Sequence, residues 1–137
     1  AAGASAERQS AWYRFGEQVG LAFQIQDDLL DTFGSEAVGK QIGGDILADK
    51  KTYLWIHTLA SGGRAVLESW QGRSDDPAAK IEAVRDAMVA AGADAEARAA
   101  MDRLVDSACA ELAGMGLDAE HNAFFSGIAQ HVVERVS

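Results

Sequence analysis

Residues 15–34 of the chain read FGEQVGLAFQIQDDLLDTFG. A helix turns by about 100° per residue, so Asp27, Asp28 and Asp31 fall on one strip about 100° wide. Gln24 shares this strip, and apolar side chains cover most of the remaining circumference. Like charges on one helix face repel each other, and apolar surroundings increase the cost. The pattern therefore predicts that a cation lies against the strip.

The segment that follows supplies groups of the opposite charge. Residues 39–54 read GKQIGGDILADKKTYL, with lysines at positions 40, 50 and 51 and a further carboxylate at Asp45. Glycine lets the backbone approach a ligand closely, and a lysine ammonium pairs well with phosphate oxygens. Magnesium usually takes one or two carboxylates and keeps its other positions for water and phosphate. Together these residues predict a site for a magnesium–diphosphate complex.

Composition limits the fold and the kind of partner. The 137 residues are 48% hydrophobic and include one proline, which indicates an all-α protein of one domain or part of one. A net charge of −9 argues against nucleic acid as a partner. No segment approaches the roughly 20 apolar residues of a membrane span. Cys109 is the single cysteine, so no intrachain disulfide is possible and a cytoplasmic location is expected.

Helical periodicity and turn residues divide the chain into helices. We expect a loop at residues 34–49, because this stretch has four glycines and no sustained period. Capping side chains before Pro77 indicate a helix start, Gly92 closes that helix, and Asp94 can cap the next one. The expected helices cover residues 6–33, 50–60 and 64–71, then run from Pro77 to Gly92, from the Asp94 cap to Gly114 or Gly116, and onward from Asp118.

Apolar side chains at helical spacing predict the buried faces of the last three helices. These positions are Ile81, Val84, Met88 and Val89, then Met101, Leu104, Val105, Ala108, Leu112 and Met115, then Phe124, Phe125, Ile128, Val132 and Val133. The tryptophans at positions 12, 55 and 70 are expected to be core or interface anchors.

Four elements in order resemble the trans-isoprenyl diphosphate synthases, also called the polyprenyl synthetase family. They are GLAFQIQDDLLD at residues 20–31, then GK at 39–40, GGDI at 43–46 and KKTYL at 50–54. The first of them resembles the second aspartate-rich motif of that family. The resemblance implies an all-α isoprenoid synthase bundle, of which residues 1–137 would be the carboxyl-terminal half.

The resemblance also implies residue roles and a reaction. Asp27 would bind Mg²⁺ directly, Asp28 and Asp31 would bind the metal or its water shell, and Asp45 would bind metal-coordinated water or orient a lysine. Lys40 and Lys50 would hold an allylic prenyl diphosphate, with Lys51 as a less certain contributor, and Gln24 would contact the substrate near its reacting end. Members extend this substrate with isopentenyl diphosphate, using magnesium, and usually work as homodimers.

The family's first aspartate-rich motif does not appear in this sequence. Asp75-Asp76, the other adjacent aspartate pair, is better explained as a helix start before Pro77. We therefore expect that the chain lacks an amino-terminal half and does not turn over substrate alone. Three alternatives stay open: a non-catalytic small subunit or scaffold that pairs with a synthase, a terpene cyclase fragment, and a plain helical interaction domain that binds no diphosphate. The lysine-containing sequel argues against the cyclase.

Overall fold

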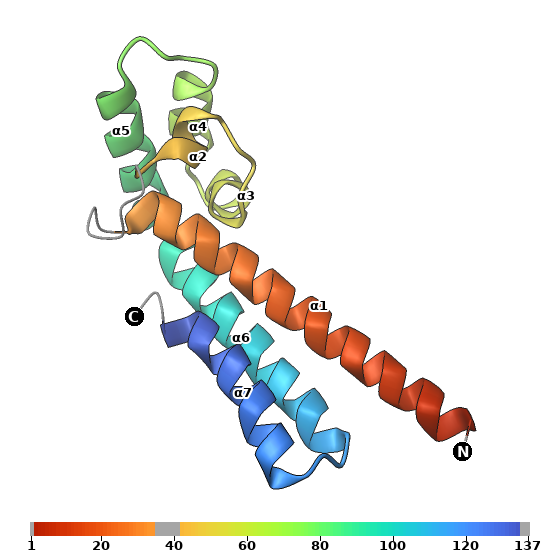
Figure 1. Ribbon diagram of the computed structural model, residues 1–137. Coiled ribbons are helices and arrows are strands. Elements are labelled where there is room, and N and C mark those ends of the chain that lie inside the picture. The colour runs from red at the N-terminus through yellow and green to blue at the C-terminus, as the bar shows by residue number, and fades with distance from the viewer. Residues whose placement is uncertain (1, 35–41, 135–137) are drawn as a thin grey trace. The chain divides into compact units, whose positions relative to one another are not determined.

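The structure is a computed structural model that describes residues 2–34 and 42–134, with side chains from residue 6 onward. Every helix or strand assigned within these ranges is an α-helix, which confirms the predicted all-α class. The helices are α1 (Ala2–Phe33), α2 (Gly44–Leu47), α3 (Tyr53–Ala60), α4 (Arg64–Trp70), α5 (Pro77–Ala90), α6 (Ala93–Gly114) and α7 (Ala119–Glu134). Figure 1 shows their order along the chain. None of the helices in the described ranges has the length and apolar character needed to cross a bilayer.

The chain divides into two compact units. The first comprises Ala1–Gln26 and Ala99–Ser137, and the second comprises Asp27–Arg98. Helices α1 and α6 each contribute residues to both units. The expectation that residues 1–137 form part of a longer domain stays a prediction.

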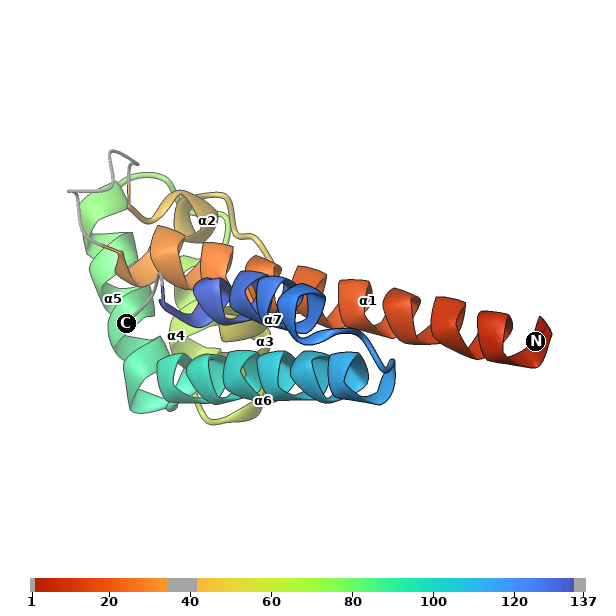
Figure 2. The same ribbon diagram turned by 60° about the horizontal axis from the view of Figure 1, so that its bottom comes forward.

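In the first unit, α1, α6 and α7 lie alongside one another, as Figures 1 and 2 show. The Arg14 guanidinium donates two hydrogen bonds to the Glu111 carboxylate, at 2.8 and 3.1 Å. The Trp12 ring packs edge-on against Phe125, with centroids 4.9 Å apart. Contacts from α1 to both α6 and α7 therefore stabilise the first unit.

The predicted buried faces are confirmed for α6 and only in part for α5 and α7. On α6, the buried residues include Met101, Val105, Ala108, Leu112 and Met115. On α7, Val132 is buried, but Phe124 and Ile128 are 63% and 44% exposed, so their predicted burial is wrong. The small Ala129 occupies the buried centre of this face, and the two larger side chains lie on its flank. Val89 of α5 is 54% exposed, because it projects away from the face formed by Val84 and Met88.

Capping side chains determine where two helices of the second unit begin. The predicted start of α5 is confirmed, since Asp76 accepts a hydrogen bond from the Ala79 N–H at 3.1 Å and Pro77 is the first helical residue. Helix α3 begins at Tyr53 rather than at Lys50, because the Thr52 hydroxyl accepts a hydrogen bond from the Trp55 N–H. Lys50 and Lys51 therefore both precede the helix.

Two further boundaries differ from the sequence prediction. Helix α6 begins at Ala93, so Asp94 lies in its first turn and does not cap it. The segment predicted as a continuous loop contains the short helix α2. Gly43 adopts φ +92° immediately before α2, and the Asp31 carboxylate accepts a hydrogen bond from the Asp45 N–H at 2.8 Å. A glycine and a tertiary carboxylate thus allow one helical turn that local periodicity did not indicate.

Candidate functional site

The last turns of α1 present three aspartates in three different environments. Asp27 is exposed, Asp31 is half-buried, and Asp28 is 4% exposed. Burial of a carboxylate is costly unless it has a charged or hydrogen-bonding partner. The acidic strip predicted from the sequence therefore exists, but its members differ in their access to solvent.

Asp31 joins the end of α1 to α2. Its Oδ2 accepts the Asp45 N–H at 2.8 Å, and its main-chain carbonyl accepts the Gly43 N–H at 2.7 Å. These bonds bring the Asp45 carboxylate, in the first turn of α2, toward the acidic end of α1. Oδ2 of Asp31 therefore stabilises the first turn of α2.

Lys50 lies between two of the acids. Its Nζ is 3.5 Å from Asp28 Oδ1 and 3.8 Å from Asp45 Oδ2. The charges of Asp45 and Asp28 raise the pKa of Lys50, so the ammonium is retained at neutral pH. Burial raises the pKa of the Asp28 carboxyl, while Lys50 acts in the opposite direction and Asp45 adds to the rise. The structure therefore brings together Asp28, Asp31, Asp45 and Lys50.

The remaining predicted site residues are placed differently. The Lys51 ammonium lies 4.0 Å from the centre of the Trp55 ring, in a cation–π contact with a buried side chain. Gln24 is exposed on α1 and belongs to the first unit. Lys40 lies outside the described residues.

The aspartates fit an open magnesium site rather than a closed one. Among residues 2–34 and 42–134, no three His, Cys, Asp or Glu side chains are placed to ligate one ion. Magnesium needs only one or two carboxylates when water and phosphate complete its shell. Exposed Asp27 could supply one such carboxylate, and Oδ1 of Asp31 could supply another. Gly44 has no side chain beside this oxygen, and a Cβ there would lie 3.4 Å from it.

Two residues next to this group were not anticipated from the sequence. Lys80 of α5 is 1% exposed, and its Nζ donates to Asp49 Oδ1 at 2.8 Å and to the Arg73 carbonyl at 3.1 Å. A signal for Lys80 was present, since it lies four residues before Val84 and shares the buried face of Val84 and Met88. Nothing in the local sequence identified Asp49 as its partner.

Gly43 is required by both its backbone conformation and its surroundings. A Cβ at this position would lie 2.7 Å from Ile81 Cδ1, and φ is +92°. Gly62 has a similar φ of +96° but open space around it. We expect Gly43→Ala to lower the free energy of unfolding by about 1–3 kcal/mol more than Gly62→Ala, because overpacking adds to the left-handed strain. Urea unfolding of both variants measures the difference, and adding Ile81→Val should recover part of it; equal losses for both glycines would contradict the packing argument.

Comparison with known protein families gives a match to the part of the chain that carries the aspartates and lysines described above. The family model for polyprenyl synthetase matches residues 1–88. The (2E,6E)-farnesyl diphosphate synthase of Mycobacterium tuberculosis is 33% identical over 98% of this chain, which spans 39% of that protein. The farnesyl diphosphate synthase of Haemophilus influenzae is 54% identical over 42% of this chain and 20% of its own length. The chain thus spans well under half of these relatives.

Solved structures show the same fold. A geranylgeranyl pyrophosphate synthase from Corynebacterium glutamicum, crystallised with isoprenyl diphosphate and magnesium, matches with a TM-score of 0.81 at 28% identity. This match covers 92% of the present chain and 37% of the solved one. Another geranylgeranyl pyrophosphate synthase matches with a TM-score of 0.83 at 27% identity, over 95% and 42% of the two chains. With its helical fold, its acidic α1 terminus and the family match over residues 1–88, the chain belongs to the polyprenyl synthetase family.

Proposed function

We propose that the second unit binds the diphosphate of an allylic prenyl substrate through Mg²⁺. The observation that best supports this proposal is the convergence of Asp28 from α1, Asp45 from α2 and the Lys50 ammonium from the segment before α3. Carboxylates beside an ammonium suit a ligand that contains both a dication and phosphate oxygens. Asp27 and Asp31 would provide oxygens to the metal or to its water shell.

The reaction that we propose is chain elongation of the allylic diphosphate with isopentenyl diphosphate, which is a transferase activity. Bound magnesium would neutralise negative charge on the departing diphosphate. Lys50 would hold the same diphosphate through charge-assisted hydrogen bonds, and Lys40 would be a second phosphate ligand. Gln24 would contact the substrate near its reacting carbon. For Lys51 to bind phosphate, its ammonium would have to leave the Trp55 ring.

Further parts of the proposal concern the whole protein. We propose a cytoplasmic homodimer, in which elongation also requires the family's first aspartate-rich motif, which does not appear in this sequence. Incubation of the purified chain with geranyl diphosphate, isopentenyl diphosphate and magnesium is therefore expected to give no elongated product. Robust product formation would overturn that expectation, and native mass measurement would give the oligomeric state.

Binding can be tested without turnover. We expect isothermal calorimetry to show that the chain binds inorganic pyrophosphate or a bisphosphonate in the presence of magnesium and loses this binding with EDTA. Asp27→Asn should weaken the binding about 10-fold or more, because a charged ligand is replaced by a neutral one. Asp75→Asn, an exposed aspartate outside the site, is the matched control and should bind as the parent does. Magnesium-independent binding, or none at all, would reject the proposed site.

A further inference from the structure

Helix α2 ends in a turn that normally requires glycine. The Asp49 N–H donates to the Ile46 carbonyl at 3.1 Å, and the Lys50 N–H donates to the Asp45 carbonyl at 3.0 Å. These two bonds define a Schellman motif, in which the residue after the helix cap adopts the left-handed conformation. That residue is Asp49, with φ +53°. Among the described residues it is the one non-glycine with positive φ.

An L-residue in this conformation is strained, although aspartate tolerates it better than most. Asp49 does not use its side chain within the turn itself. Its Oδ1 accepts the Lys80 Nζ at 2.8 Å, and its Oδ2 accepts the Gly72 N–H at 2.9 Å. Both carboxylate oxygens therefore bond to residues of α5 and of the connection before it.

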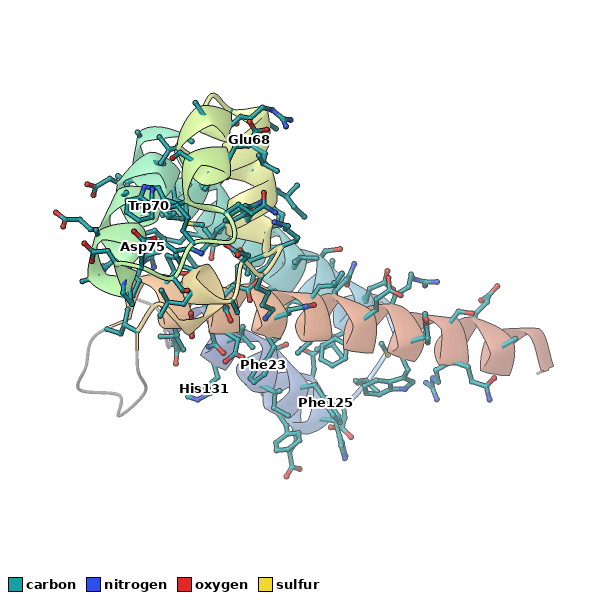
Figure 3. The ribbon with its side chains drawn as sticks, turned by 90° about the horizontal axis from the view of Figure 1, so that it is seen from above. Phe23, Glu68, Trp70, Asp75, Phe125 and His131 are labelled. Atoms are coloured by element: carbon teal, nitrogen blue, oxygen red, sulfur yellow. The ribbon has the colours of Figure 1, made fainter. Side chains whose placement is uncertain are left out.

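Lys80 is a costly partner to bury. With 1% of its surface exposed, its ammonium has lost nearly all contact with water. Its Nζ bonds to Asp49 and to the main-chain carbonyl of Arg73 in the α4–α5 connection. Trp70 and Asp75 mark this connection in Figure 3. A strained residue and a buried charge thus meet at one point, and such features are retained where a conformation must be maintained.

The position of this pair along the chain indicates what is maintained. Asp49 directly precedes Lys50, whose ammonium lies between Asp28 and Asp45. The left-handed turn at Asp49 sets the direction in which the main chain leaves α2, and hence where the Lys50 side chain begins. We infer that Asp49 and Lys80 are positioning residues whose ion pair holds Lys50 in place for the diphosphate. The identity of the ligand in this inference rests on the proposed function. The placement of Lys50 rests only on the contacts described above.

A variant without the ion pair separates positioning from general stabilisation. In Lys80→Met/Asp49→Asn, methionine fills the buried space without a charge, and asparagine still tolerates the left-handed conformation. Asp75→Asn is the matched control, because Asp75 forms an exposed ion pair with Arg73 in the same connection. Amide hydrogen exchange followed by NMR measures the protection of the Lys50 N–H, and calorimetry measures the magnesium-dependent affinity for inorganic pyrophosphate.

We expect protection of the Lys50 amide to fall about tenfold relative to the α5 amides in the double variant, since the left-handed turn is no longer held by the pair. Pyrophosphate affinity should fall about tenfold as well, and the Asp75→Asn protein should match the parent in both measurements. A purely structural pair would lower protection uniformly and leave the affinity of the folded protein unchanged, which would overturn the inference. Loss of Lys50 protection without loss of affinity would also overturn it. If the parent binds no pyrophosphate, the proposed function fails, and the exchange data alone decide whether the pair positions Lys50.

Discussion

Replacing Asp49 with alanine is expected to lower the free energy of unfolding by about 3–5 kcal/mol, because the buried Lys80 ammonium loses its charged partner. Alanine also lacks the tolerance of aspartate for the left-handed conformation at φ +53°. Urea unfolding followed by far-UV circular dichroism measures the loss, provided that the slope with urea is unchanged.

The same ion pair predicts strong non-additivity. In Lys80→Met/Asp49→Asn no buried charge is left unpaired, and replacement of a buried pair by well-packed neutral groups is often neutral or stabilising. The double variant should therefore be more stable than Asp49→Ala by at least about 2 kcal/mol. A double variant that is as unstable as the single one would show that packing, and not the uncompensated charge, dominates.

Acid should remove the contribution of Asp49. Burial acts to raise the pKa of this carboxyl, but the hydrogen bonds from Lys80 and from the Gly72 N–H outweigh it and hold the pKa below the ordinary value of 3.8. The unfolded chain then binds more protons than the folded chain in this range, so stability rises with pH. The stability difference between the parent and Asp49→Asn should be fully present above about pH 4 and should disappear as the pH falls through the lower folded pKa. Paired urea titrations between about pH 7 and pH 2.5 test this, and a constant difference would contradict it.

Replacing Lys50 with methionine is expected to reduce the magnesium-dependent affinity for inorganic pyrophosphate by about 10- to 150-fold. This range corresponds to the loss of one hydrogen bond between charged groups, about 1.5–3 kcal/mol. Half of the Lys50 side chain is exposed, so methionine fits in its place, but buried Asp28 loses a charged partner and the variant should also be less stable than the parent. Calorimetry at fixed magnesium concentration measures the change.

Lys51 is the matched control for this experiment, since it differs from Lys50 by one position and has the same charge. Its ammonium lies over the Trp55 ring, so Lys51→Met should lower the affinity by less than about threefold while costing some cation–π stabilisation. Equal losses for the two variants would show that overall positive charge, rather than the placement of Lys50, determines binding. A larger loss for Lys51→Met would reverse the assignment of the two lysines.

The acidic motif could be read from the sequence because helical geometry is local. The spacing of Asp27, Asp28 and Asp31 places them on one strip whatever surrounds the helix, and the lysines after position 39 indicate a phosphate partner. Helix starts at Pro77 and near Arg64 were recognised for the same reason, since capping and turn residues act over a few positions. The buried face of α6 likewise follows from its period.

Other features depend on contacts between segments that are distant in the sequence. Helix α2 forms because Asp31, fourteen residues earlier, accepts the Asp45 N–H, and no local pattern contains that bond. Periodicity also marks too broad a face on α7, because it cannot tell which apolar side chains have a neighbour to pack against; Phe124 and Ile128 remain exposed.

The sequence by itself determined the all-α class, the acidic strip on α1 and the family, because these depend on residue type and on spacing along one helix. Only the tertiary structure decided that Lys50 lies between Asp28 and Asp45, that Lys51 lies over Trp55, and that Lys80 is buried against Asp49. The physical reason is that an ion pair forms only when two side chains lie close together in space, and the local sequence does not show which residues will meet. A lysine on an apolar helix face has no identifiable partner until the chain has folded back to bring one within hydrogen-bonding distance.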